Sequence, residues 1–388
     1  MDLKLSRRDF TFASLGLAAC AAAPHKALGA SRAYTGPNVI IIRYGGGVRR
    51  RETIDPQYSY SPYLAKVLRQ QGTLYPQMRI EAREGIDTSH AQGTLFILTG
   101  RYDRYEDVSG KFLRERFEPK VPTLFEYLRQ TYDVPDHQAL IVNGENRQDE
   151  DFLTFSTDPH YGVRYRSSVL SLHQFKSYLL RKKIAAGAFD GEALTRAKQQ
   201  LVEMEAGDLR RDAVPQSPRL ETFWRDWQRD YGESGFKNPR GDRLLTALSL
   251  RALAELKPKL MLINYQDPDY VHWGNASHYT RAISVIDEGI RQLVTATEAD
   301  PVYRGNTVFV VVPDCGRDDN GMLQVPYQHH FNSKAAHEIW ALIFGPGVAR
   351  GAVVDRPVEQ ISLARTIARM MRFDAHAAEG PILEEVFA

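Results

Sequence analysis

Carboxylate and imidazole side chains occur in three short clusters, and each cluster comes soon after a run of apolar residues. Asp, His and Cys are the residue types that bind Zn²⁺ and similar divalent ions. A lone Asp-x-x-His motif is more often a chance pairing on the surface. Several such clusters, each following an apolar run, favour a metal site instead. The candidate ligands are Asp267, Asp269 and His272 in the first cluster, Asp314 and Cys315 in the second, and His329 and His330 in the third.

Two hydroxyl side chains, those of Thr88 and Ser89, come directly before a run of helical character. The Ser89 hydroxyl is the better candidate nucleophile, because metal coordination can activate it to form a covalent ester intermediate. Alternatively, Thr88 and Ser89 cap the helix that continues through Leu95. The sequence leaves both roles open.

A Gly-Gly-Gly loop at residues 45–47 follows the first apolar run, between Arg43 and Arg49. Its backbone N–H groups could approach an anion, or the glycines could simply make a tight turn. Arg43, Arg49 and Arg317 are candidates to hold an anionic substrate group. The sequence has neither a P-loop Lys-Ser/Thr pair nor a Gly-x-Ser-x-Gly elbow, which disfavours P-loop nucleotide hydrolysis and a serine α/β-hydrolase.

Short apolar strands alternate with longer helical patterns along the chain, and these elements must position the candidate residues. This alternation predicts an α/β fold: a doubly wound, mostly parallel sheet with helices on both faces. Ligands of such sheets bind beyond the carboxyl ends of the strands, where all three clusters fall. The predicted strands are residues 39–42, 139–142, 260–263, 307–312 and 339–344.

One α/β domain is predicted for residues 34–388, interrupted by a helical insertion or cap at about residues 150–240, where charge is high and strand signals are few. The formal net charge of +2 gives no general attraction to nucleic acid, so no nucleic-acid partner is expected. The basic run at residues 49–51 is interpreted as a solvated loop or an anion-facing turn.

Residues 1–30 have the pattern of an export signal: Arg7 and Arg8 precede a short apolar run that is too short to span a membrane. The arginine pair followed by Phe10 is typical of a twin-arginine signal, so the export machinery of that route is an expected partner. Leu-Ala-Ala-Cys, ending at Cys20, matches a lipobox, and cleavage near Ala30 is the alternative. We expect a periplasmic or cell-surface protein whose contact with membrane would be a lipid anchor at Cys20.

The order of these motifs resembles that of the alkaline phosphatase superfamily, which includes sulfatases, nucleotide phosphodiesterases and cofactor-independent phosphoglycerate mutases. The resemblance covers most of the chain outside residues 150–240. The matching segments are 89–102, which resembles the nucleophile segment running into Leu-Thr-Gly-Arg, 121–128, 267–272, 314–316, 329–330 and 339–348.

The resemblance implies two metal ions, but the chain departs from the pattern for one of them. The first ion would take Asp269 or Asp267, His272 and His330 or His329. For the second ion, the glycine loop replaces an expected first-strand Asp, and Cys315 stands where a His follows Asp314. Counting back from Leu-Thr-Gly places His90 at the usual nucleophile position, beside Ser89 and Thr88.

The sequence therefore predicts an exported, metal-dependent hydrolase of phosphate or sulfate esters, with Zn²⁺ as the expected cofactor and one ion favoured over two. Its substrate would be an anionic ester or an esterified glycan, attacked by Ser89 or by a metal-bound hydroxide. The alternative is a non-catalytic surface protein for binding or scaffolding, which keeps the fold with an incomplete metal site.

Overall fold

The computed structural model describes residues 32–108, 116–144, 153–204, 217–233, 241–272, 275–318, 327–329 and 333–388. The predicted export signal with Cys20, part of the predicted insertion and His330 therefore lie outside the described residues. Within the described part, every helix is too short or too polar to cross a lipid bilayer.

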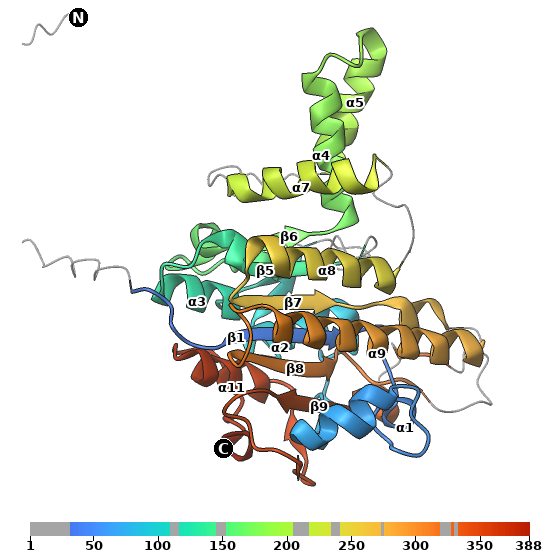
Figure 1. Ribbon diagram of the computed structural model, residues 1–388, viewed down its shortest axis with the longest axis vertical. Coiled ribbons are helices and arrows are strands. Elements are labelled where there is room, and N and C mark those ends of the chain that lie inside the picture. The colour runs from blue at the N-terminus through green and yellow to red at the C-terminus, as the bar shows by residue number, and fades with distance from the viewer. Residues whose placement is uncertain are drawn as a thin grey trace, which may run out of the picture.

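A nine-stranded sheet forms the centre of the molecule, in the order β10-β2-β9-β8-β1-β7-β5-β6, with β11 paired to β2 (Figure 1). Strands β8, β1, β7, β5 and β6 are parallel, whereas β9 is antiparallel to both β8 and β2. The strands are β1 (Asn38–Tyr44), β2 (Gly72–Arg79), β5 (Ala139–Asn143), β6 (Ser168–Leu170), β7 (Leu260–Asn264), β8 (Thr307–Pro313), β9 (Glu338–Phe344), β10 (Ala352–Val353) and β11 (Val358–Glu359).

Helices cover both faces of the sheet, so the predicted fold class is confirmed. Alternate residues of β1 separate two apolar cores: Val39 and Ile41 point into one, Ile40 and Ile42 into the other. The first core is closed by α2 (His90–Thr99), α3 (Leu124–Thr131) and α11 (Ser362–Met371). The second is closed by α4 (Leu172–Ala185), α7 (Pro218–Tyr231), α8 (Asp242–Leu256) and α9 (Ala276–Ala299).

The region predicted as a helical insertion contributes both to the sheet and to a projection away from it. Strand β6 extends the sheet edge by pairing in parallel with β5. Helices α4 and α5 (Gly191–Met204) rise from this end of the sheet, and α7 crosses beside them (Figure 1). Smaller elements are α1 (Arg50–Thr53), α10 (Lys334–His337) and the antiparallel pair β3 (Tyr105–Asp107) and β4 (Phe117–Pro119).

The register of the three central strands brings their carboxyl ends to one edge of the sheet. Arg43 near the end of β1 is level with Asn264 at the end of β7 and with Val312 of β8. The loops that leave these strands carry the first two candidate clusters. The edge therefore positions loops that are more than 200 residues apart in the chain.

Candidate metal centre

Asp269, His272 and His329 converge at this edge of the sheet. The Asp269 Oδ1 atom lies 3.2 Å from His272 Nε2 and 3.2 Å from His329 Nε2. Tetrahedral ligands about 2.0–2.1 Å from a zinc ion are about 3.3 Å from one another. The carboxylate of Asp269 thus lies at a ligand-like distance from each histidine, and the potential ligand atoms of all three side chains lie within 4.8 Å of one another.

The structure separates the two aspartates that the sequence left as alternatives. Asp269 is on a short 3₁₀ turn, Asp267–Tyr270, and faces the histidines. Asp267 instead accepts a hydrogen bond from the Asp242 N–H group (3.2 Å), at the start of α8. Its own N–H donates to the Asp242 carboxylate (2.8 Å). Asp267 therefore anchors the loop, and Asp269 is the residue placed to bind an ion.

His90 joins this group, although the sequence suggested no ligand role for it. Its Nε2 atom lies 2.7 Å from Asp269 Oδ1 and its Nδ1 atom 2.5 Å from Asp314 Oδ2. Its ring packs against that of His329, with centroids 4.4 Å apart. The only sequence signal was its position, at the place where the superfamily pattern has a nucleophile.

Helix α2 brings His90 to Asp314 because it packs very closely on the end of β8. A Cβ atom at Gly93 would lie only 2.3 Å from the Asp314 carbonyl oxygen, so glycine permits this approach. Ser89 is the N-cap of α2, and its Oγ accepts a hydrogen bond from the Gln92 N–H group (3.3 Å). The same hydroxyl donates to Gln92 Oε1 (3.3 Å). Because the N-cap directly precedes His90, the first residue of α2, it fixes the direction in which the helix begins.

Thr88 is buried and linked to His329 in two ways. Its hydroxyl donates a short hydrogen bond to the His329 carbonyl oxygen, and its own carbonyl oxygen lies 3.3 Å from His329 Nδ1. A partner on Nδ1 orients the ring so that Nε2 faces Asp269. Thr88 is thus positioned to align a candidate metal ligand.

Asp314 is fully buried and surrounded by donors of the protein itself. Its Oδ1 accepts hydrogen bonds from the N–H groups of Cys315 (2.9 Å) and Gly47 (3.3 Å). Its Oδ2 lies beside His90 Nδ1, and the Nε atom of Arg43 is 3.9 Å away.

Burial and the nearby Asp314 charge raise the pKa of the Cys315 thiol well above its ordinary value. Cys315, His90 and His329 form a second group with ligand atoms within 4.8 Å.

Two buried arginines, Arg43 and Arg317, lie beside this network. Arg43 donates to the His90 carbonyl oxygen (3.2 Å) and to the Thr94 hydroxyl. The guanidinium of Arg317 donates to five backbone carbonyl oxygens, and burial lowers its pKa. These carbonyls belong to Gly46, Gly47, Pro268, Val271 and Tyr327. Arg317 thus ties three loops of the site together.

A basic cavity of about 330 Å³ adjoins Arg317, lined by Arg49, Arg50, Arg51, Glu52, Ala335 and Glu338. Arg49 pairs with Glu52 (2.8 Å) and covers the rings of Tyr279 and Tyr327. Arg50 binds the carbonyl oxygens of Ile339 and Met78, whereas Arg51 is exposed. Guanidinium groups thus outnumber carboxylates in this lining.

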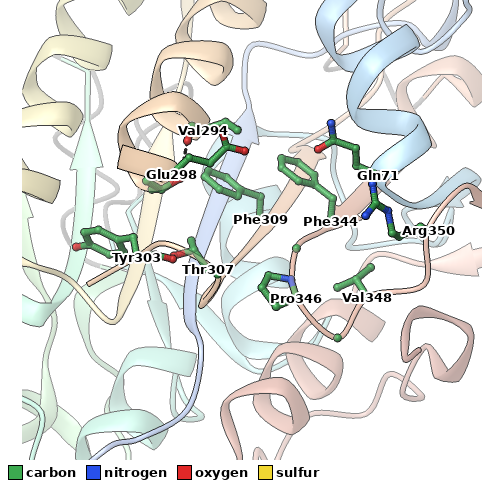
Figure 2. A pocket seen from close by; sticks show the side chains of 14 residues that line it. Gln71, Val294, Glu298, Tyr303, Thr307, Phe309, Phe344, Pro346, Val348 and Arg350 are labelled. Atoms are coloured by element: carbon green, nitrogen blue, oxygen red, sulfur yellow. Dashed lines mark hydrogen bonds between the residues drawn. The ribbon is translucent and has the colours of Figure 1, made fainter. Parts of the chain in front are cut away.

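A larger pocket of about 400 Å³ lies at the opposite edge of the sheet (Figure 2). It is bounded by the start of β8 and the end of β9, where the rings of Phe309 and Phe344 stack with centroids 4.9 Å apart. None of the residues predicted to do chemistry lines it. The candidate metal centre is therefore separate from this pocket.

No family model matches the sequence, and no curated protein matches it. Solved structures do match the fold. A protein in the alkaline phosphatase superfamily from Vibrio parahaemolyticus is 14% identical, with a TM-score of 0.54 over 92% of this chain and 73% of that one. The wild-type alkaline phosphatase PafA is 11% identical, with a TM-score of 0.53 over 92% of this chain and 100% of that one.

The lipoteichoic acid synthase LtaP from Listeria monocytogenes is also similar, at 11% identity and a TM-score of 0.51, over 90% of this chain and 74% of that one. At such low identities the likeness establishes the fold and leaves the chemistry to be argued from the site. The chain has the fold of the alkaline phosphatase superfamily.

Proposed function

We propose that this protein is an exported, metal-dependent hydrolase of phosphate or sulfate esters. The observation that carries the proposal is the convergence of Asp269, His272 and His329, with Asp269 at 3.2 Å from each histidine and all three potential ligand atoms within 4.8 Å of one another. These residues lie beyond the carboxyl ends of parallel strands, where α/β folds bind their ligands. The solved relatives named above include a phosphatase, which is consistent with ester chemistry on this fold.

In this proposal the protein's own groups bind and orient the ester. Asp269, His272 and His329 would hold a divalent ion, with Zn²⁺ as the favoured identity, and the ion would supply Lewis acidity at an ester oxygen. The cavity beside Arg317 would receive the anionic part of the substrate, because its lining carries a surplus of guanidinium groups. Attack would come from the Ser89 hydroxyl or from water.

Export and surface location complete the proposal and rest on the N-terminal sequence. The arginine pair at residues 7 and 8 would direct the chain to the twin-arginine machinery, and Cys20 would carry a lipid anchor in the periplasm or on the cell surface. Mass spectrometry of the protein from its native membrane would detect the lipid on Cys20. A mature chain that begins after Ala30 would exclude the anchor.

The direct test is hydrolysis of a panel of aryl phosphate mono- and diesters and aryl sulfates, with and without added Zn²⁺ or Mn²⁺. Asp269→Ala and His272→Ala should abolish a metal-stimulated activity. Asp355→Ala is a matched control, because Asp355 is an exposed carboxylate outside the centre. Activity that survives both ligand substitutions would exclude the metal mechanism.

A non-catalytic surface protein is the second candidate, and one observation favours it. Two groups that the sequence offers for acting on a substrate are engaged with the protein itself: Arg317 binds five carbonyl oxygens, and the Ser89 hydroxyl caps a helix. This candidate predicts metal binding, or none, without turnover of any ester in the panel. Turnover that depends on Asp269 would rule it out.

A further inference from the structure

At the sequence position where the superfamily pattern has an anionic ligand for a second ion, this chain has the glycine loop, which packs tightly against neighbouring backbone. A Cβ atom at Gly46 would lie 2.3 Å from the Asp269 backbone nitrogen, and one at Gly47 would lie 2.6 Å from the Gly316 carbonyl oxygen. Both glycines have positive φ, at +88° and +69°. No carboxylate can be accommodated there, so the loop supplies no anionic ligand from this segment.

Asp314, the anionic ligand that remains, is already held by the protein. Both of its oxygens have protein partners, in the N–H groups of Cys315 and Gly47 and in the His90 ring. The permanent positive charge of Arg43 lies 3.9 Å from its Oδ2 atom, and neither side chain is exposed. A divalent ion at Asp314 would have to replace these contacts and would be repelled by the guanidinium.

The His90 imidazole lies in the gap between the two carboxylates of the centre. One ring nitrogen is 2.5 Å from Asp314 and the other 2.7 Å from Asp269. The ring therefore lies between Asp269, which faces His272 and His329, and Asp314, whose oxygens are held by the protein.

We propose that Arg43 and His90 take the place of the second metal ion, so that the centre binds one ion, at Asp269, His272 and His329. The proposal rests on the proposed function only in assuming that this centre binds metal. Arg43 supplies a fixed positive charge beside Asp314, and His90 connects Asp314 to the metal-binding carboxylate. Asp314 is then a positioning residue, and Cys315 is a buried thiol outside the coordination sphere.

The number of bound ions per chain distinguishes a one-ion centre from a two-ion centre, and the cobalt spectrum shows whether Cys315 is a ligand. We expect elemental analysis of the purified protein, loaded with Zn²⁺ and freed of excess ion, to give one ion per chain. Loading with Co²⁺ should give visible ligand-field bands without the near-ultraviolet charge-transfer band of a cobalt–thiolate bond. Cys315→Ala should keep the ion and the spectrum, whereas His272→Ala should lose both.

Two outcomes overturn the inference while leaving the proposed function intact: two ions per chain, or a thiolate band that disappears in Cys315→Ala. One ion without turnover of any ester would leave the inference standing and remove the proposed function. A protein that binds no ion even in excess Zn²⁺ would contradict both.

The role of Arg43 is tested by stability rather than by turnover. Arg43→Gln should lower the thermal unfolding midpoint by the same amount with and without Zn²⁺, because the guanidinium acts beside Asp314 independently of the ion. If Zn²⁺ restored the midpoint of Arg43→Gln and the count rose to two, an ion could enter that place and the inference would fail. If Arg43→Gln does not fold, the wild-type metal count still decides.

Discussion

The Nδ1 atom of His90 lies 2.5 Å from the Oδ2 atom of Asp314, although the two residues are 224 positions apart in the chain. This contact connects the first turn of α2 to the loop after β8, beside the candidate metal ligands. It depends on the close packing at Gly93, where any side chain would meet the Asp314 backbone. The geometry of the centre is therefore set by how a helix of one half of the chain packs on a strand of the other.

Gly46→Ala should disrupt the metal centre, because its Cβ atom would lie 2.3 Å from the Asp269 backbone nitrogen. Gly85→Ala is a matched control: its φ of +84° is close to the +88° of Gly46, but a Cβ atom there has no neighbour within 4 Å. The control should lose about 1 kcal/mol of unfolding free energy from backbone strain alone. Gly46→Ala should lose more and also bind Zn²⁺ more weakly, as measured by calorimetric titration. Equal Zn²⁺ affinities for the two variants would contradict the clash.

Arg317→Lys should lower the free energy of unfolding by at least about 2 kcal/mol, because one ammonium cannot donate to five carbonyl oxygens, four of them in buried hydrogen bonds. It should also weaken metal binding, since two of the released carbonyls hold the loop of the candidate ligands: Pro268 directly precedes Asp269, and Val271 directly precedes His272. Urea unfolding and Zn²⁺ titration measure the two effects. Arg365→Lys, at an exposed helical position, should change stability by less than about 0.5 kcal/mol.

Glu126 should make stability fall as the pH rises toward neutrality. Its burial raises the pKa to about 7 from an ordinary value of 4.5, so the folded chain binds a proton that the unfolded chain has released between these two values. The stabilisation is complete below about pH 4.5 and is lost as the pH passes through about 7. Glu126→Gln removes this titration, so its unfolding free energy, relative to wild type, should rise across that range. A difference that does not change with pH would show that Glu126 has an ordinary pKa in the fold.

Ser89→Ala should destabilise the protein by about 1 kcal/mol, because it removes the N-cap of α2. Ser89→Asn should restore most of that stability, since an asparagine side chain also caps helices. The two variants also separate the roles left open by the sequence. If Ser89 is only a cap, Ser89→Asn keeps ester hydrolysis; if it is also the nucleophile, both variants lose it.

The sequence was sufficient for the fold class because the central strands are long and almost wholly apolar. The five predicted strands correspond to β1, β5, β7, β8 and β9. Strand β2 was not among them, since Pro76 interrupts its pattern and its pairing with β9 shifts register between Tyr75 and Met78. Strand β6, in the predicted insertion, is only three residues long. Its place in the sheet depends on pairing with β5 rather than on its own composition.

Local sequence could not determine which residues of the centre meet. Asp267 and Asp269 are equivalent in type, and only the 3₁₀ turn and the contact with Asp242 direct one of them away from the histidines. The sequence offered Arg317 as a residue to hold an anionic substrate group. It could not reveal that five backbone carbonyl oxygens would surround the guanidinium. The role of His90 depends on the packing of α2, which is a tertiary contact and has no local signal.

The order of strands in the sheet has a consequence for how the protein is made. Strand β1, near the start of the described chain, lies between β7 and β8, which are synthesised more than 200 residues later. While a ribosome is still translating the middle of the chain, the amino-terminal third has no partners for its central strand. Such long-range parallel pairing folds slowly. Truncated or stalled chains will therefore lack the candidate centre altogether, because its side chains can meet only after the polypeptide is complete.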